Sequence, residues 1–239
     1  MITALSPAVL RARSVAYAVV ARLLGPDVTP LTDPEMISAL RTALGAAGET
    51  AALGRLDGFV VEDLPDAQVL AGRWVRWFDL GRVAPYEASN LTASAGGDTA
   101  RLADVAGFYR AFNMAVKGDR PDHVVAQLEF LALTLLAEAE AVERDEVDNA
   151  DVAARATRSF LRDHVGSWLD AWASRIGEID ELRPWFPLAA AAADLVRTEA
   201  ASRNVIPLRD AAALRADAGI PDDDEALLNC ADEPLDFPS

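Results

Sequence analysis

The side chains with the clearest chemical capacity are two histidines, His123 and His164, each directly preceded by an aspartate. An Asp–His pair can exchange protons, but adjacent residues on a helix point about 100° apart and do not face each other. A di-iron helical bundle needs a glutamate three residues before each histidine, and Arg120 and Leu161 stand there instead. The sequence has no zinc helix of the His-Glu-x-x-His type and no phosphate-binding loop ending in Lys-Ser/Thr, and Cys230 is its single cysteine. These residues favour a binding protein over an enzyme, with no catalytic residue, no metal site and no cofactor.

The pattern of helix starts and stops indicates which elements carry these residues. Ser6-Pro7 and Asp33-Pro34 each place a capping side chain before a proline, an arrangement that opens helices. No run of alternating apolar and polar residues indicates a strand. Helices are predicted over residues 7–24, 34–45, 49–56, 66–80, 98–116, from 121 onward, 150–176, 188–202 and 211–216. The fold class is therefore all-α, with roughly eight or more helices, and His123 falls in the first turn of the longest one.

Two segments interrupt this helical pattern. Residues 81–97 contain proline, asparagine and a Gly-Gly pair, and they are predicted to form a long loop of the kind that often carries function. Gly118 precedes Pro121, so residues 117–121 are the predicted hinge within one globular domain that spans residues 1–218. Residues 219–239 are acidic and are predicted to be a mostly irregular tail.

Composition excludes several classes of protein. Of the 239 residues, 51% are apolar, which is too many for an intrinsically disordered chain. The formal net charge is −16, so no nucleic-acid partner is expected, because phosphates need a basic face. No run reaches the roughly 20 apolar residues that cross a bilayer, and Arg22 interrupts the apolar segment that a secretory leader would need. The sequence predicts a soluble, cytoplasmic protein without stable membrane insertion.

Two neighbouring segments resemble one protein family. Residues 104–112 (DVAGFYRAF) and 119–131 (DRPDHVVAQLEFL) are similar to the central signature of the TorD/DmsD/NarJ chaperones, in which a Pro-x-Asp-His-type element opens a helix that continues as Glu-Leu-Glu-Phe. Gln127 departs from this pattern, because an acidic residue is usual there. Segments 74–87 and 160–168 are similar to flanking aromatic parts of the family. The matching residues of the signature are Pro121, Asp122, His123, Leu128, Glu129 and Phe130.

The resemblance implies a protein that binds another polypeptide. Members of this family are cytoplasmic chaperones that hold the twin-arginine leader, or an equivalent N-terminal segment, of a molybdenum-cofactor oxidoreductase catalytic subunit until the cofactor is inserted. The expected site is an apolar groove with an acidic rim, since exposed ion pairs contribute about 0–1 kcal/mol each and buried leader side chains about 1.5–3 kcal/mol each. The residues expected to form this site are Trp74, Phe78, Pro85, Tyr86, Glu87, Phe108, Phe112, Pro121, Asp122, His123 and Glu129.

Several of these residues also have structural interpretations. Asp122 can cap the helix behind Pro121, and Glu129 can be a solvated surface acid. The four aromatic residues are spaced as on helices and can instead belong to the core, and His164 is expected to be structural. The alternative function is a small-ligand or guanine-nucleotide-binding regulator, although no phosphate cradle is evident. The expected assembly is a monomer or a domain-swapped dimer, and the segment 107–112 leans toward the nitrate- and selenate-type branches of the family.

Overall fold

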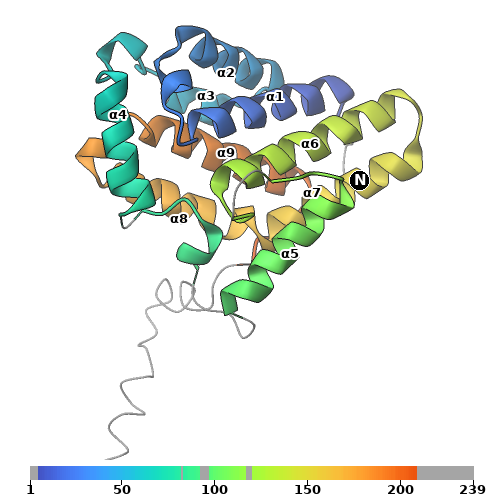
Figure 1. Ribbon diagram of the computed structural model, residues 1–239. Helices are drawn as coiled ribbons and strands as arrows, with labels where there is room; N and C mark the ends of the chain where they lie inside the picture. The colour runs from blue at the N-terminus through green and yellow to red at the C-terminus, as the bar shows by residue number, and fades with distance from the viewer. Residues whose placement is uncertain (1–4, 82, 92–96, 117–119, 209–239) are drawn as a thin grey trace, which may run out of the picture. The chain divides into compact units, whose positions relative to one another are not determined.

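The computed structural model describes residues 5–81, 83–91, 97–116 and 120–208 (Figure 1). Within these residues the regular elements are helices, and the absence of any strand longer than an isolated bridge confirms the all-α prediction. The α-helices are α1 (Pro7–Leu23), α2 (Pro34–Ala47), α3 (Thr50–Arg55), α4 (Ala67–Trp74), α5 (Gly97–Ala111), α6 (Val124–Glu143), α7 (Val147–Asp163), α8 (Val165–Gly177) and α9 (Phe186–Ser202). Residues 117–119 of the predicted hinge, the predicted short helix at 211–216 and the predicted tail at 219–239 lie outside the described residues, and the domain-swapped dimer stays a prediction.

Helix starts follow the capping signals of the sequence. Ser6, Asp33 and Asp66 cap α1, α2 and α4, and each accepts a hydrogen bond from a backbone N–H in the first turn. The second helix runs past the predicted end at Gly45, because the left-handed residue that ends it is Gly48, with φ of 73°. None of the described helices combines the length and the apolar character needed to span a membrane.

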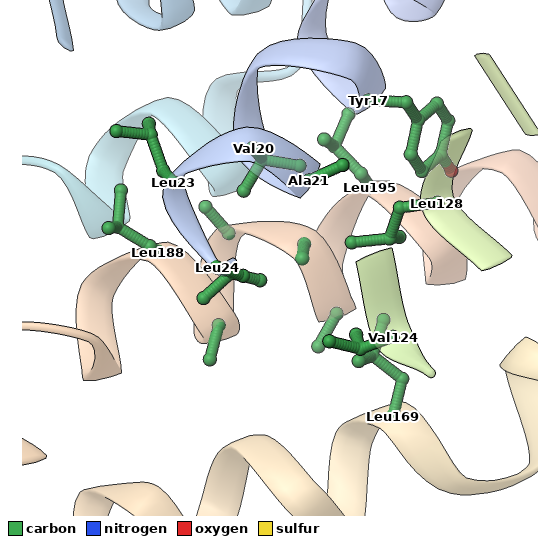
Figure 2. Packing of buried hydrophobic residues seen from close by; sticks show 14 of the residues in the cluster. Tyr17, Val20, Ala21, Leu23, Leu24, Val124, Leu128, Leu169, Leu188 and Leu195 are labelled. Atoms are coloured by element: carbon green, nitrogen blue, oxygen red, sulfur yellow. The ribbon is translucent and has the colours of Figure 1, made fainter. Parts of the chain in front are cut away.

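The core lies where α1, α6 and α9 meet. The first helix packs against α2, α6 and α9, while α8 packs against α9 from another side (Figure 1). Figure 2 shows the packed side chains, which include Tyr17 and Val20 of α1, Leu24 directly after it, Val124 and Leu128 of α6, Leu169 of α8, and Leu188 and Leu195 of α9. All of these residues are at most 1% exposed. Val124 is the first residue of α6, so its burial in the core fixes the start of this helix. The position of His123, directly before it, is thereby fixed as well.

Two aromatic clusters contain four of the aromatic residues predicted to form a groove, Trp74, Phe78, Phe108 and Phe112. Trp74 and Phe78 are 2% and 0% exposed, their ring centroids lie 4.3 Å apart, and they pack against Trp172 and Trp185. This burial corrects the expectation that Trp74 and Phe78 face a ligand and agrees with their alternative interpretation as core residues. The physical reason is that a large aromatic side chain gains most when it is removed from water on all sides.

The second aromatic cluster joins α5 to the longer helices. Phe108 of α5 and Phe112, directly after this helix, are half-buried and make edge-to-face contacts with Phe130 of α6, and Phe108 also contacts Phe160 of α7. These contacts also assign Phe108 and Phe112 mainly to packing. They fix the C-terminal end of α5 near the first turns of α6.

Two more helices end earlier than predicted. The helix predicted over 66–80 changes at Trp74 into a π-helical turn, Val75–Asp79. The helix predicted to reach Val116 ends at Ala111, after which Asn113 adopts a positive φ of 54°. After each change the chain follows a different path from that of a continuous helix. On each of these paths, residues reach the site described below.

The helix predicted over 150–176 is two helices, α7 and α8, which meet at His164. At this residue φ is −124° and ψ is −101°, so the helical hydrogen-bond ladder is interrupted. A Cβ atom at Gly166 would lie 2.2 Å from the carbonyl oxygen of Leu161, and only glycine permits this close approach. The sequence pattern did not reveal this break because the apolar spacing continues on both sides of it.

Candidate functional site

A cavity of about 820 Å³ opens beside the first turns of α6. We call it the His123 groove. Its lining combines apolar side chains with two carboxylates, one guanidinium and one imidazole. The lining residues are Pro26, Asp79, Tyr86, Ala115, Val116, Arg120, His123, Val125, Ala126 and Glu129.

The groove is held together by a short backbone pairing between two distant segments. Tyr86 and His123 form an isolated antiparallel β-bridge. The N–H of Val124 donates to the carbonyl of Pro85 at 2.8 Å, and the N–H of Glu87 donates to the carbonyl of Asp122 at 3.0 Å. This pairing fixes the loop that carries Tyr86 to the start of α6.

The two candidate prolines act through their carbonyl groups. Pro85 is buried and its carbonyl accepts the Val124 bond, while the carbonyl of Pro121 accepts a hydrogen bond from the hydroxyl of Tyr109 at 2.8 Å. Burial raises the pKa of Tyr109 far above its usual value, so this hydroxyl remains a donor. These contacts give Pro85 and Pro121 a role in positioning the groove rather than in lining it.

Tyr86 and Glu87 point to opposite sides of the loop. Tyr86 has extended backbone angles, and successive side chains of an extended segment alternate. Tyr86 lines the groove, whereas Glu87 is 1% exposed and faces the interior. This placement corrects the expectation that Glu87 contributes a carboxylate to the rim.

Glu87 is the centre of a buried polar network. Its carboxylate accepts a hydrogen bond from the side-chain amide of Gln127 at 2.5 Å, lies 3.1 Å from Nδ1 of His164, and lies 3.8 Å from Nε of Arg101. The amide oxygen of Gln127 accepts a hydrogen bond from the indole N–H of Trp168 at 3.0 Å. His164 is therefore structural, as expected, and it ties the α7–α8 junction to the loop.

The same network explains why an amide suits position 127. Gln127 is fully buried and donates to a carboxylate on one side while it accepts from an indole on the other. A carboxylate at this position would face Glu87 with a like charge in a site closed to water, which is costly. The departure from the family pattern at Gln127 therefore has a local physical reason in this chain.

Asp122 is fully buried and pairs with Arg120. Arg120 donates from Nε to one carboxylate oxygen of Asp122 at 2.9 Å and from a terminal nitrogen to the other at 2.8 Å. The N–H of Ala88 also donates to this carboxylate, at 3.0 Å. The interpretation of Asp122 as the cap of this helix is wrong, because His123 occupies the capping position of α6.

His123 presents a neutral ring to the groove. Its Nδ1 accepts a hydrogen bond from the N–H of Val125 at 3.1 Å, and burial lowers the pKa of the ring from 6.5 to about 4. The neutral ring therefore carries its proton on Nε2. No partner for Nε2 occurs among the described residues, so this N–H can donate to a ligand in the groove.

Two carboxylates line the groove without a cation. In the described part of the chain, neither Asp79 nor Glu129 forms an ion pair, and both residues are exposed. Partial burial raises the pKa of Glu129 above its usual value. A visiting cation would relieve this cost, since an opposite charge stabilises a partly desolvated carboxylate.

The structure brings together three of the predicted site residues, Tyr86, His123 and Glu129, at one cavity. Sequence reasoning missed Asp79, which reaches the groove through the π-helical turn, and Arg120, whose spacing of two residues from Asp122 was the available signal. No group of three His, Cys, Asp or Glu residues in the described ranges is placed to hold a metal ion. The groove thus offers a ligand apolar contact, negative charge and a neutral hydrogen-bond donor.

A groove that combines apolar surface with carboxylates on a helical framework has the chemistry of a surface that can receive a polypeptide segment. The family model described as nitrate reductase delta subunit matches residues 40–174, more than half of the chain, and the chain belongs to this family. It is also 33% identical over 143 residues to the selenate reductase assembly chaperone protein of Thauera selenatis, an alignment that covers 57% of this chain and 69% of that protein. No solved structure matches the chain.

These comparisons confirm the family predicted from the Pro-x-Asp-His element. The protein is an assembly chaperone of the molybdoenzyme type and not an enzyme. The groove beside His123 is consequently considered below as a place for a client polypeptide rather than for a substrate.

Proposed function

We propose that the His123 groove binds the N-terminal leader of the catalytic subunit of a molybdoenzyme in the cytoplasm and holds that subunit until its cofactor is inserted. The observation that carries this proposal is the pair of carboxylates, Asp79 and Glu129, which have no ion-pair partner among the described residues and lie beside apolar side chains of the groove. A twin-arginine leader offers the complementary chemistry, because it joins two cations to a short apolar stretch.

The contributions of apolar and charged contacts to leader binding can be compared from their typical free energies. Binding at micromolar strength corresponds to about −8 kcal/mol, and exposed ion pairs supply only about 0–1 kcal/mol each. Apolar contacts with Val116, Val125 and Tyr86 therefore supply most of the affinity, at about 1.5–3 kcal/mol for each fully buried leader side chain. The carboxylates and the His123 donor fix the register of the leader, since charged hydrogen bonds are directional.

The alternative of a guanine-nucleotide regulator receives no support from this cavity. Asp79 and Glu129 would repel phosphate groups, and the guanidinium of Arg120 is already engaged by Asp122. Titration with nucleotide serves as the control for titration with leader peptide.

Replacement of the two rim carboxylates is expected to weaken leader binding. The double variant Asp79→Asn with Glu129→Gln should raise the dissociation constant for a twin-arginine leader peptide about ten-fold, measured by isothermal titration calorimetry. Both residues are exposed and have no ion-pair partner among the described residues, so the fold should be retained. The matched control is Asp148→Asn with Glu178→Gln, two exposed acids away from the groove, and it should bind as the wild type does. Equal affinity of all three proteins would contradict the proposed site.

Salt should weaken leader binding only in part. A rise in ionic strength from about 0.1 to 1 M shortens the screening length from about 10 to 3 Å, which weakens contacts of exposed charges and leaves apolar burial intact. We expect the dissociation constant to rise about three- to ten-fold over this range, in line with two exposed charge contacts. A loss of binding of several orders of magnitude would show that charge alone carries the interaction and would contradict the apolar groove.

A further inference from the structure

The guanidinium of Arg120 contacts Asp122 in the geometry with which a binding site holds the arginine side chain of a ligand. We propose that Tyr86 and Asp122 form a binding site for an arginine side chain, that Arg120 fills this site in the present structure, and that an arginine of the client leader takes its place. The identity of the incoming arginine rests on the proposed function, whereas the site itself rests only on the residues described here.

Three contacts hold the guanidinium of Arg120. Two are the parallel hydrogen bonds to Asp122, at 2.9 and 2.8 Å, and the third is the ring of Tyr86, whose centroid lies 4.3 Å from the guanidinium carbon. A planar fork paired with a carboxylate and stacked on an aromatic face is the way in which proteins recognise arginine. Tyr86 and Arg120 both line the His123 groove, so the site opens toward the space assigned to the client.

The burial of Asp122 makes the exchange selective. Its side chain is 0% exposed, and a buried carboxylate deprived of its cation is strongly unfavourable. Arg120 can therefore leave only when another cation enters. A lysine ammonium is a point charge that lacks the two-point fork and stacks less well on Tyr86, so the entering group is a guanidinium.

Arg120 itself is able to leave. Its side chain is 38% exposed, and among the described residues its hydrogen bonds and ring contact are those with Asp122 and Tyr86. A rotation of this side chain into water would vacate the site without a change in the backbone pairing at Tyr86 and His123. While it stays in place, Arg120 competes with the leader and lowers its apparent affinity.

Chemical rescue of Arg120→Ala tests the site without any client. The variant should unfold at a lower temperature than the wild type, because Asp122 loses its cation. Millimolar ethylguanidinium, which matches the end of an arginine side chain, should raise the midpoint of the variant by about 2–4 °C and leave the wild type unchanged. Ethylammonium at the same concentration and ionic strength should raise neither. Equal effects of the two cations, or no effect of either, would overturn the proposal.

Two further variants make the rescue specific. Arg162 forms the same two-point contact with Asp163, at 2.7 and 2.6 Å, but on an exposed part of α7. Arg162→Ala should show no rescue, because water hydrates Asp163. Should Arg120→Ala fail to fold, Arg120→Lys keeps a cation beside Asp122 but lacks the fork, and ethylguanidinium should again raise its midpoint while ethylammonium does not.

Binding of leader peptide separates this inference from the proposed function. Arg120→Ala should bind a twin-arginine peptide about five- to ten-fold more tightly than the wild type, because the resident competitor is gone, and a twin-lysine peptide should gain less. If rescue succeeds and neither protein binds the peptide, the arginine site stands and the proposed function fails. If the wild type binds the peptide and rescue fails, the proposed function stands and the arginine site is overturned.

Discussion

The variant Glu87→Ala is expected to lose about 3–5 kcal/mol of unfolding free energy, the range found when one partner of a buried ionic group is removed. Glu87 is 1% exposed, and its carboxylate joins the 3₁₀ turn Glu87–Ser89 to Gln127 of α6, to Arg101 of α5 and to His164. Alanine would leave the buried Gln127 amide without its acceptor and Nδ1 of His164 without its partner, so that Asp104, 3.4 Å from Nε2, would be the remaining acidic contact of the ring. Urea unfolding followed by circular dichroism measures the loss.

An exposed carboxylate that makes equally good contacts provides the control. Glu143 accepts two hydrogen bonds from Arg11, but its side chain is 44% exposed. Glu143→Ala should therefore cost no more than about 1 kcal/mol. A similar loss in the two variants would show that burial of the Glu87 network has no special weight.

Loss of the Glu87 side chain should also affect the groove. The residue lies next to Tyr86 in a segment whose backbone is paired with the start of α6. Without its interior anchor, this segment would hold Tyr86 less firmly, and a leader bound there would lose part of its contact. The buried network is thus the support on which the groove is built.

Most of the helical framework follows from local signals in the sequence. Capping residues before prolines fixed the starts of α1 and α2, because these side chains satisfy backbone donors that only a helix start leaves open. The division at His164 escaped the same reasoning. It depends on contact between Gly166 and the backbone of Leu161, which no helical periodicity records.

The site was only partly accessible to sequence reasoning. Asp122 and His123 were recognised as a motif, but which of the two faces the interior depends on the pairing of His123 with Tyr86, 37 residues earlier in the chain. The same pairing sends Glu87 inward and Tyr86 outward. Pairing between distant segments depends on the tertiary structure. The burial of single polar residues, which follows from this pairing, could therefore not be predicted from the sequence.

His123 should make the stability of the protein depend on pH between about 4 and 6.5. Burial lowers the pKa of the folded ring to about 4, whereas the unfolded ring titrates near 6.5. Between these values the unfolded chain binds the extra proton, so the free energy of unfolding falls as pH falls. The contribution of His123 to this loss reaches about 3 kcal/mol when the pH has dropped from 7 to 4.

The variant His123→Asn isolates this contribution. Asparagine keeps a side-chain acceptor at the capping position of α6 and does not titrate. The stability advantage of the wild type over the variant should therefore shrink as pH falls from 7 to 4, because a group that titrates in both proteins, such as Glu129, cancels in the comparison. A difference that is independent of pH would contradict the buried neutral ring. Above about pH 6 the folded ring stays neutral, so leader affinity should not change with pH there through His123, and its Nε2 proton remains available to a client.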